Sequence, residues 1–296
     1  MTVSFFKLHV AGDDFILVDR TRPGHEVLRE RPDTLAPLAQ AICDRCRGVG
    51  GRGVAFIGPD AAERKGALSV RIFAANGTEK YEGEDAYLCV ARWATDSGRA
   101  AGGKVRLTAS NGGEHILSAL DSRSFAVELP APRAEENGRM ELLLDGRPET
   151  AFIFRGNGRW AATIGRENSP TPKRVRDALA VAIPDAIPVI ARPAGRDLIR
   201  FSTIYGADRF GAAAAAVAAG IAAGRTDESA VAEWRGKGAA VAYANFASHS
   251  AKSGAAAGPG TLIDRGRFFV EWKSPEKILI AGLAEYSFEG HYDHDA

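Results

Sequence analysis

The residues best suited to acid–base chemistry are carboxylates at the start of a helical pattern. Glu82, Glu84 and Asp85 precede or open an apolar periodicity that predicts a helix over residues 85–98. The positive end of a helix dipole stabilises carboxylate side chains. Carboxylates at this position would repel a substrate anion, whereas a helix start without them commonly binds anions. Two roles remain open: Asp85 caps the helix with Glu84 beside it, or one of these carboxylates moves a proton.

Three cysteines give little support for thiol or metal chemistry. Cys43 and Cys46 have C-x-x-C spacing, but the chain has no second pair of cysteines or histidines to complete a zinc site. An odd number of cysteines also argues against a disulfide framework. The pair falls near the end of a predicted helix (residues 33–46), whereas a redox motif opens a helix after a strand. We therefore expect one buried thiol and one chance neighbour.

Other polar residues could bind a ligand, but each has an ordinary structural alternative. Arg159 and Arg209 could hold a substrate carboxylate by bidentate pairing, or they could lie on the surface. His9 and His115 fall in predicted strands, where a packed and hydrogen-bonded histidine is the more frequent outcome. The segment EGHYDHD (residues 289–295) has metal-capable side chains, yet chain ends tend to fray. We predict a solvated tail there rather than a built metal site, with adventitious metal binding left open.

Composition excludes several classes of protein. The 296 residues have a formal net charge of +1, with 45% hydrophobic and 25% charged residues, as is ordinary for soluble globular proteins. This near-zero charge gives no electrostatic argument for nucleic acid or an anionic membrane as a partner. The N-terminus opens directly into a predicted strand, and no apolar run is long enough to span a bilayer. We expect a cytoplasmic protein.

Alternating apolar residues and turn residues predict a strand-rich chain. Strands are expected in the first half over residues 4–10, 15–18, 54–57, 68–73, 104–108, 115–117 and 125–129. In the second half they are expected over residues 140–144, 150–155, 160–164, 187–191, 198–202, 266–272 and 277–283. Helical patterns cover residues 33–46, 85–98, 171–182 and 211–223.

The order of these elements predicts an α+β fold with an internal repeat. A Pro- and Glu-containing stretch, residues 130–138, indicates a connection, so we place two halves at residues 1–132 and 133–296. Whether the final strand returns to the first half is left open. The Gly-, Ala- and Ser-rich stretch 236–260 is expected to form a surface loop, with an active-site lid as the alternative.

Several blocks, in order, resemble those of diaminopimelate epimerase. RIFAANGTE (residues 71–79), with Cys89 and Arg92 after it, resembles the R-I-F-N-x-D-G-S-E block and the C-x-A-R that follows. The other blocks are FKLHVAGDDF (6–15), CDRCRGVGGRG (43–53), TASNGG (108–113), GNGRW (156–160), GAAAAAVAA (211–219), and FVEW with IAG (269–272, 280–282). The resemblance implies two pseudo-symmetric halves, each a sheet wrapped around a buried helix (84–97 and 211–223), and a cofactor-independent reaction in the cleft between them.

The catalytic positions of that family are altered here. Its first catalytic cysteine aligns with Gly83 and its second falls near Asp208, while Cys89 takes a later, non-catalytic position and should be buried. Isomerases of phenazine biosynthesis look like a precedent on this fold, because they move a proton with carboxylates. The resemblance thus implies Asp208, Glu84 and Asp85 as candidate acid and base. The candidate substrate-binding residues are Asp13, Asn76, Asn157, Arg159 and Arg209.

Three functions fit these observations. The first is a cofactor-independent isomerase or epimerase that acts on a small amino-acid-like acid through carboxylates rather than thiols. The second is an inactive homologue that binds a metabolite or a partner. The third is an enzyme of a specialised biosynthetic pathway with a changed reaction. A small molecule is the expected partner in the first case, and the resemblance is compatible with a homodimer.

Overall fold

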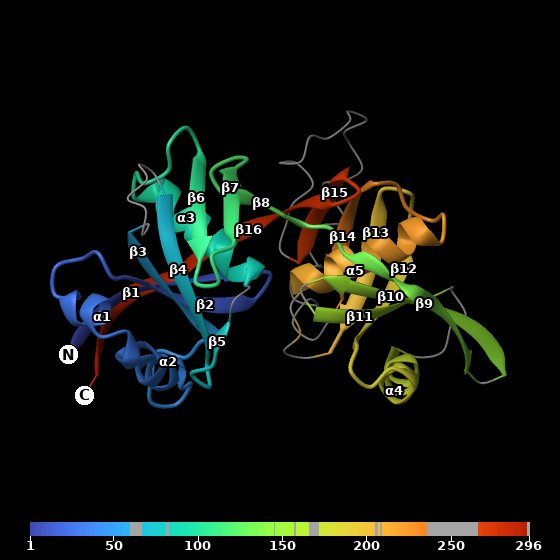
Figure 1. Cartoon of the computed structure of the whole chain (residues 1–296), viewed down its shortest axis with the longest axis horizontal. Helices are drawn as coiled ribbons and strands as arrows, with labels where there is room; N and C mark the ends of the chain where they lie inside the picture. The colour runs from blue at the N-terminus through green and yellow to red at the C-terminus, as the bar shows by residue number, and fades with distance from the viewer. Residues whose placement is uncertain are drawn as a thin grey trace, which may run out of the picture. The chain divides into compact units, whose positions relative to one another are not determined.

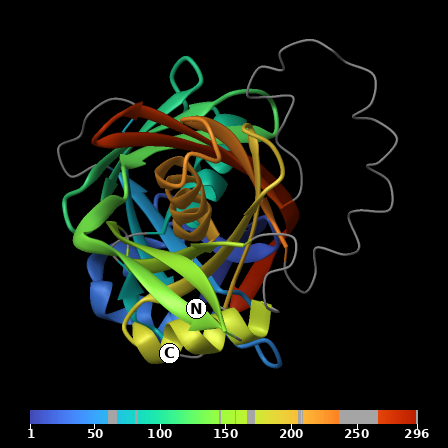
Figure 2. The ribbon, with the colours of Figure 1, turned by 90° about the vertical axis from the view of Figure 1, so that its right-hand side faces the viewer.

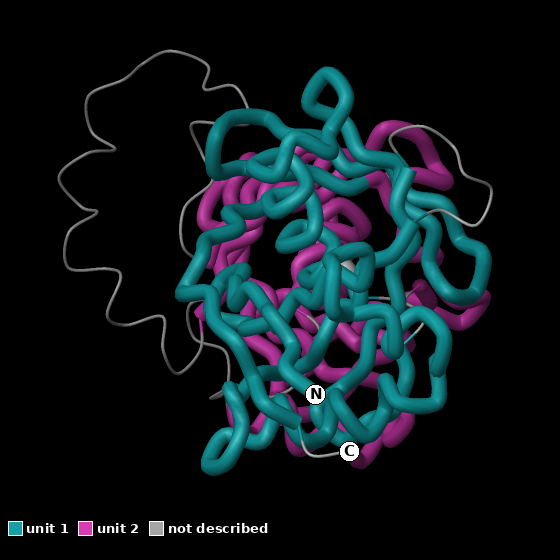
Figure 3. The backbone as a smooth tube through the Cα atoms, turned by 90° about the vertical axis from the view of Figure 1, so that its left-hand side faces the viewer, with its two compact units in different colours: residues 1–127, 282–296 teal, residues 128–281 magenta. Residues whose placement is uncertain are grey.

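The computed structural model describes residues 1–59, 67–80, 83–144, 146–156, 158–165, 172–204, 207, 209–235 and 266–294, with Glu84 and Pro172 described by their backbone alone. The chain forms two compact units, coloured separately in Figure 3. Unit 1 comprises residues 1–127 and 282–296, and unit 2 comprises residues 128–281. The last stretch of the chain therefore belongs to the unit that contains its beginning.

Unit 1 is built on a mixed sheet (Figure 1). Its strands follow in the order β1 (Thr2–Val10), β2 (Asp13–Asp19), β3 (Gly53–Pro59), β4 (Ala67–Ala74), β6 (Lys104–Ala109), β7 (Glu114–Ala119) and β8 (Ser124–Pro130). The short β5 (Glu79–Lys80) pairs with β4, and β16 (Lys277–Asp293) pairs with β1. Two neighbouring pairs, β2–β3 and β4–β6, are parallel. Parallel neighbours need a crossover connection. The crossover from β2 to β3 contains α1 (Glu26–Glu30), η1 (Pro32–Thr34) and α2 (Leu35–Cys43), and the crossover from β4 to β6 contains α3 (Glu84–Asp96).

Unit 2 has the same kind of construction. Its strands, from one edge, are β9 (Arg133–Leu144), β10 (Arg147–Gly156), β11 (Gly158–Ile164), β12 (Ile187–Pro193), β13 (Leu198–Thr203), β14 (Ser229–Trp234), β15 (Arg267–Ser274) and the beginning of β16. The pairs β11–β12 and β13–β14 are parallel, with α4 (Pro172–Ala182) and α5 (Arg209–Ala222) as their crossovers. The remaining neighbours whose pairing is described in this unit are antiparallel.

One helix in each unit lies at the centre of its strands. α3 packs against β1, β2, β3, β6 and β7, and α5, orange in Figure 2, packs against six strands from β10 to β15. Both helices are buried, as the sequence predicted. The small residues of α5 allow this close approach: a Cβ added at Gly220 would lie 2.3 Å from Oγ1 of Thr226. The second long helix of each unit, α2 or α4, covers a separate apolar cluster.

The structure confirms a strand-rich fold of mixed helices and strands, while pseudo-symmetry between the halves stays a prediction. Two local expectations were wrong. Residues 133–138, expected to form a connection, are the start of β9. Residues 289–293, expected to fray, pair with β1 from Phe6↔Glu289 to Thr2↔Asp293. The terminal amino group donates to the His294 carbonyl at 2.6 Å, so an N-terminal strand holds the C-terminus in place.

The stretch 236–260 lies outside the described residues. Among the helices that the structure does describe, none is long and apolar enough to cross a membrane.

Candidate functional site

Three elements of unit 1 bring charged side chains together at one end of α3. Asp13 is the first residue of β2 and follows the β1–β2 turn directly. In this turn Ala11 (φ 51°) and Gly12 (φ 86°) take left-handed conformations. Arg52 stands just before β3, and its backbone N–H donates to the carbonyl of Asp14 at 2.8 Å. Asp85 is the second residue of α3. The parallel pairing of β2 and β3 thus places Asp13 and Arg52 side by side.

The three side chains form an Asp13–Arg52–Asp85 cluster. Nη1 of Arg52 lies 2.6 Å from Oδ2 of Asp13 and 3.8 Å from Oδ2 of Asp85. The two carboxylate side chains are only 9% and 4% exposed, whereas that of Arg52 is 26% exposed. A buried carboxylate needs a counter-charge, and here one guanidinium serves two of them. The cluster therefore carries an excess of negative charge, and Arg52 is its member most open to solvent.

Of the two roles considered for Asp85, capping is wrong. Gly83 holds the N-cap position, and Asp85 lies inside the first turn with its carboxylate buried towards Arg52. The side chain of Glu84 lies outside the described part of the structure. At Gly83, which the sequence resemblance aligns with the family's first catalytic cysteine, a Cβ would lie 2.7 Å from Cδ1 of Ile72. Ile72 thus fills the space into which a cysteine side chain would extend.

Asp14 follows Asp13 but has a different environment, since successive side chains of a strand point to opposite faces. Its carboxylate pairs with Lys7 at 3.1 Å and with Arg45 at 2.8 Å. Burial alone would raise the pKa of Asp14, but the hydrogen bonds from Arg45 and Lys7 outweigh it and hold the pKa below its ordinary value. With two cations for one carboxylate, Asp14 is suited to a structural role.

The thiols near the cluster are poor nucleophiles. Cys89 is buried on α3 one turn after Asp85, and burial followed by the charges of Asp85, Asp13 and Asp14 raises its pKa well above the ordinary value. Burial, and then Asp14, raises the pKa of Cys43 to about 12. Both thiols are therefore protonated at neutral pH. Cys46 is exposed, as expected of a chance neighbour.

The structure gives the other described candidates partners of their own. Arg159 pairs with Glu135 through two hydrogen bonds of 2.8 and 2.7 Å and also with Asp185, contacts that raise its pKa. Arg209 opens α5 with its guanidinium 3.8 Å from the ring centre of Trp234. Asn76 is exposed in the turn after β4, where its Oδ1 accepts a 3.0 Å hydrogen bond from the N–H of Thr78. None of these contacts joins Arg159, Arg209 or Asn76 to the Asp13–Arg52–Asp85 cluster.

The remaining sequence candidates lie outside the described residues or are histidines on strands of unit 1. Glu82, Asn157 and Asp208 lie outside the described residues. His115 stacks on Tyr87 of α3 with ring centres 4.8 Å apart, as expected of a packed histidine. Nδ1 of His9 is buried and has no hydrogen-bond partner in the described part of the chain. Within the same part, no group of three or more His, Cys, Asp or Glu side chains could hold a metal ion.

Sequence reasoning missed two charged residues with clear roles. The sequence assigns Arg52 no role beyond the matching block of residues 43–53, although a cation just before a buried strand is an expected counter-charge for nearby acids. Glu233 of β14 is 1% exposed and pairs with Arg200, Arg235 and Arg267 at 2.9, 3.1 and 3.4 Å. Three cations around one carboxylate favour a structural role for Glu233, in contrast to the acid excess at Arg52.

Comparison with solved structures defines the class of fold. The chain is similar to a phenazine biosynthesis protein of the PhzF family from Enterococcus faecalis, with a TM-score of 0.62 and 11% identity over 99% of this chain and 100% of that one. It is also similar to a hydroxyproline epimerase from Agrobacterium vitis, with a TM-score of 0.59 and 12% identity over 98% and 91% of the two chains. At such identities the likeness shows the fold alone.

Comparison with the sequences of known proteins shows which kinds of enzyme the chain resembles. No protein-family profile matches the chain. It is 35% identical to the O-ureido-serine racemase of Streptomyces lavendulae over 45% of this chain and 42% of the racemase, less than half of that relative. It is 25% identical to the diaminopimelate epimerase of Pelotomaculum thermopropionicum over 98% of this chain and 99% of that enzyme. The predicted resemblance to diaminopimelate epimerase-like proteins is confirmed, and the relatives are racemases and epimerases.

Proposed function

We propose that the chain is a cofactor-independent isomerase or epimerase that moves a proton on a small, amino-acid-like acid by means of carboxylates. The observation that carries the proposal is the Asp13–Arg52–Asp85 cluster at the start of α3. Its position supports the proposal, because the resemblance aligns Asp85 with the block that holds the family's first catalytic cysteine. The racemase and epimerase names of the relatives support the same reaction class.

The two carboxylates and one guanidinium of the cluster suggest how it would bind a substrate and move a proton. Arg52, the most exposed member, would bind the carboxylate of an incoming acid. The substrate carboxylate would then share this guanidinium with Asp13 and Asp85. A protonated Asp85 can return a proton to a carbanion, and an ionised Asp85 can remove one. Asp208 and Glu84 remain the proposed second acid–base groups.

Cysteine takes no part in this proposal. The pKa of Cys89 is raised well above its ordinary value by burial and by the same carboxylates that would act on the substrate. The position aligned with the family's first catalytic thiol is Gly83, with Ile72 packed against it.

Solvent exchange tests whether the chain is an enzyme at all. The protein would be incubated in heavy water with amino and hydroxy acids, including O-ureidoserine, diaminopimelate, serine and proline, and proton NMR would follow loss of the signal next to the carboxyl group. We expect protein-dependent exchange for at least one acid. If an acid binds but none exchanges, the isomerase proposal falls.

A binding protein without turnover is the second candidate, and the replacement of the thiol by Gly83 with Ile72 against it is the observation that favours it. A changed reaction in a specialised biosynthetic pathway is the third. We also propose that the two units are pseudo-symmetric, on the ground that each has one central helix and two parallel crossover pairs. A cytoplasmic location, a small-molecule partner and a homodimer remain predictions from the sequence.

A further inference from the structure

Unit 1 contains a pocket of about 420 Å³ at the C-terminal end of α3. This volume falls in the range of roughly 300–1,000 Å³ that is usual for small-molecule sites. Its lining side chains come from β1, from the segment around the end of β2, from the end of α3 and from β16, all within unit 1. Asp85 is at the opposite end of α3, about 16 Å away at a rise of about 1.5 Å per residue.

Three aromatic side chains line this pocket and pack side by side. The ring centre of Phe6 in β1 lies 6.5 Å from that of Trp93 in α3 and 6.2 Å from that of Tyr286 in β16. Trp93 is buried, whereas Tyr286 is 37% exposed, so the aromatic wall reaches from the core to the surface. Aromatic rings pack favourably against a further ring at centre separations of about 4.5–7 Å. The wall is therefore suited to the planar body of an aromatic ligand.

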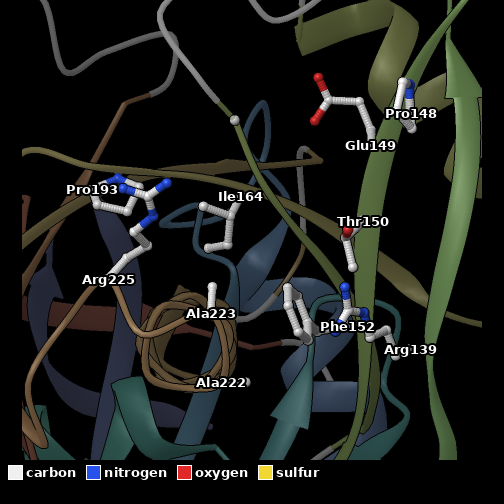
Figure 4. A pocket seen from close by; sticks show the side chains of 11 residues that line it. Arg139, Pro148, Glu149, Thr150, Phe152, Ile164, Pro193, Ala222, Ala223 and Arg225 are labelled. Carbon is white, nitrogen blue, oxygen red and sulfur yellow. The ribbon is translucent and has the colours of Figure 1, made fainter.

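Unit 2 has a pocket of about 480 Å³ at the C-terminal end of its own central helix, α5 (Figure 4). Ala222, Ala223 and Ile164 line it, together with the aromatic ring of Phe152. Neither a tryptophan nor a tyrosine is among its described lining residues. The wall of three aromatic side chains thus distinguishes the pocket of unit 1.

The charged groups of the pocket leave one arginine without an acid. Oδ2 of Asp19, a residue that is only 3% exposed, lies 2.9 Å from Nη2 of Arg99. Oδ2 of Asp96 lies 2.6 Å from Nε of Arg92. Each carboxylate of the pocket thus has an arginine partner of its own. Arg22 also lines the pocket and forms no ion pair within the described part of the chain.

The turn after β2 holds Arg22 beside the aromatic wall. The N–H of Arg22 donates to the carbonyl of Asp19 at 3.4 Å, and its guanidinium lies 4.8 Å from the ring centre of Phe6. One guanidinium N–H donates to Oγ of Ser4 at 3.3 Å. A guanidinium has five N–H donors, so donors remain for the two oxygens of a carboxylate. Because the cation and the ring are only 4.8 Å apart, one small molecule can contact both.

We propose that this pocket is a second ligand site, separate from the Asp13–Arg52–Asp85 cluster, and that it binds an aromatic carboxylic acid. Arg22 pairs with the carboxylate, and the rings of Phe6 and Tyr286 contact the aromatic body. An aromatic amine would meet the charge of Arg22, while both carboxylates of the pocket already have arginine partners. An anion without a ring would leave the aromatic wall uncovered.

An NMR titration of the whole chain tests this assignment, with benzoate, phenylacetate and 2-naphthoate as probes. Amide signals of Thr21, Arg22 and Ser97 would be followed while each acid is added to 10 mM. The strongest binder would then be compared with its neutral primary amide and with acetate. We expect saturable shifts with at least one acid and affinity at least tenfold lower for both comparison compounds. The amide loses the charge-assisted hydrogen bonds, and acetate loses the aromatic contact.

Variants that stay folded by circular dichroism complete the test. Arg22→Gln should weaken binding at least tenfold, and Tyr286→Leu, which keeps an apolar side chain but removes the ring, about two- to tenfold. Arg31→Gln, which removes an exposed arginine outside the pocket, should bind like the wild type. Asp85→Asn should do so too, which separates this site from the proposed catalytic one. The assignment is overturned if no probe acid shifts the pocket amides, if the amide or acetate binds as tightly, or if Arg22→Gln or Tyr286→Leu binds like the wild type.

Discussion

Replacing Arg52 by methionine should destabilise unit 1 far more than an ordinary surface substitution would. The variant keeps most of the side-chain volume but leaves two carboxylates, 9% and 4% exposed, without the guanidinium that faces both. Removing one partner of a fully buried pair costs about 3–5 kcal/mol. Because Arg52 is itself 26% exposed, solvent screening reduces this cost, and we expect a loss of about 2–4 kcal/mol.

Urea denaturation at neutral pH measures this loss, with Arg31→Met as the matched control. Arg31 pairs with Asp33 at 3.1 Å, but both side chains are about two-thirds exposed (66% and 67%). Exposed pairs contribute about 0–1 kcal/mol, so this control should change little.

A double variant distinguishes charge from packing. Arg52→Met combined with Asp85→Asn removes the charge of one of the two buried carboxylates that face the lost guanidinium, so it should recover part of the lost stability. The reasoning is refuted if Arg52→Met costs no more than Arg31→Met, or if the double variant is no more stable than Arg52→Met alone.

Three further predictions follow from the packing and charges. Asp14→Asn should lower the melting temperature at pH 7 but not at about pH 2, and calorimetry at both pH values checks this. The pKa of Asp14 is lowered by folding, so its carboxylate stabilises the fold above the pKa of the unfolded state, and this stabilisation is lost as the pH falls through the pKa of the folded state. Only Cys46 should react quickly with Ellman's reagent in the native protein, since the other thiols are buried; fast reaction of two would contradict it. Gly220→Ala should cost about 1–3 kcal/mol in urea denaturation, because its Cβ would meet Thr226 at 2.3 Å, and a neutral outcome would be inconsistent with this packing.

Much of the fold could be predicted because its signals are local. Alternating apolar residues indicated most strands, and the small-residue run of α5 indicated a buried helix. The two wrong expectations concern segments in which pairing with a neighbouring strand outweighs a polar local sequence. Residues 133–138 and 289–293 are polar, yet β9 pairs with β10 and β16 pairs with β1, so hydrogen bonds to a neighbouring strand order both segments.

The site was predictable only in part. Asp85 could be singled out because an acid at a helix start is visible in the sequence, and Asp13 because it occupies a matched position. Neither signal reveals that one guanidinium faces both carboxylates. Arg52 contacts Asp13, 39 positions away, where β2 and β3 pair, and Asp85, 33 positions away, at the start of α3. Asp13 and Asp14, adjacent in sequence, have different partners because successive side chains of a strand point to opposite faces.

The most direct test of the central claim is the rate of solvent deuterium incorporation by Asp85→Asn. Asp33→Asn, which changes an exposed carboxylate, serves as the control, and circular dichroism confirms that each variant is folded. With whichever acid the wild type exchanges, Asp85→Asn should lose about two or more powers of ten in rate, the usual scale for a lost general acid or base, and Asp208→Asn should do the same. Exchange by a folded Asp85→Asn variant at the rate of Asp33→Asn would contradict the claim that carboxylates of the Asp13–Arg52–Asp85 cluster move the proton.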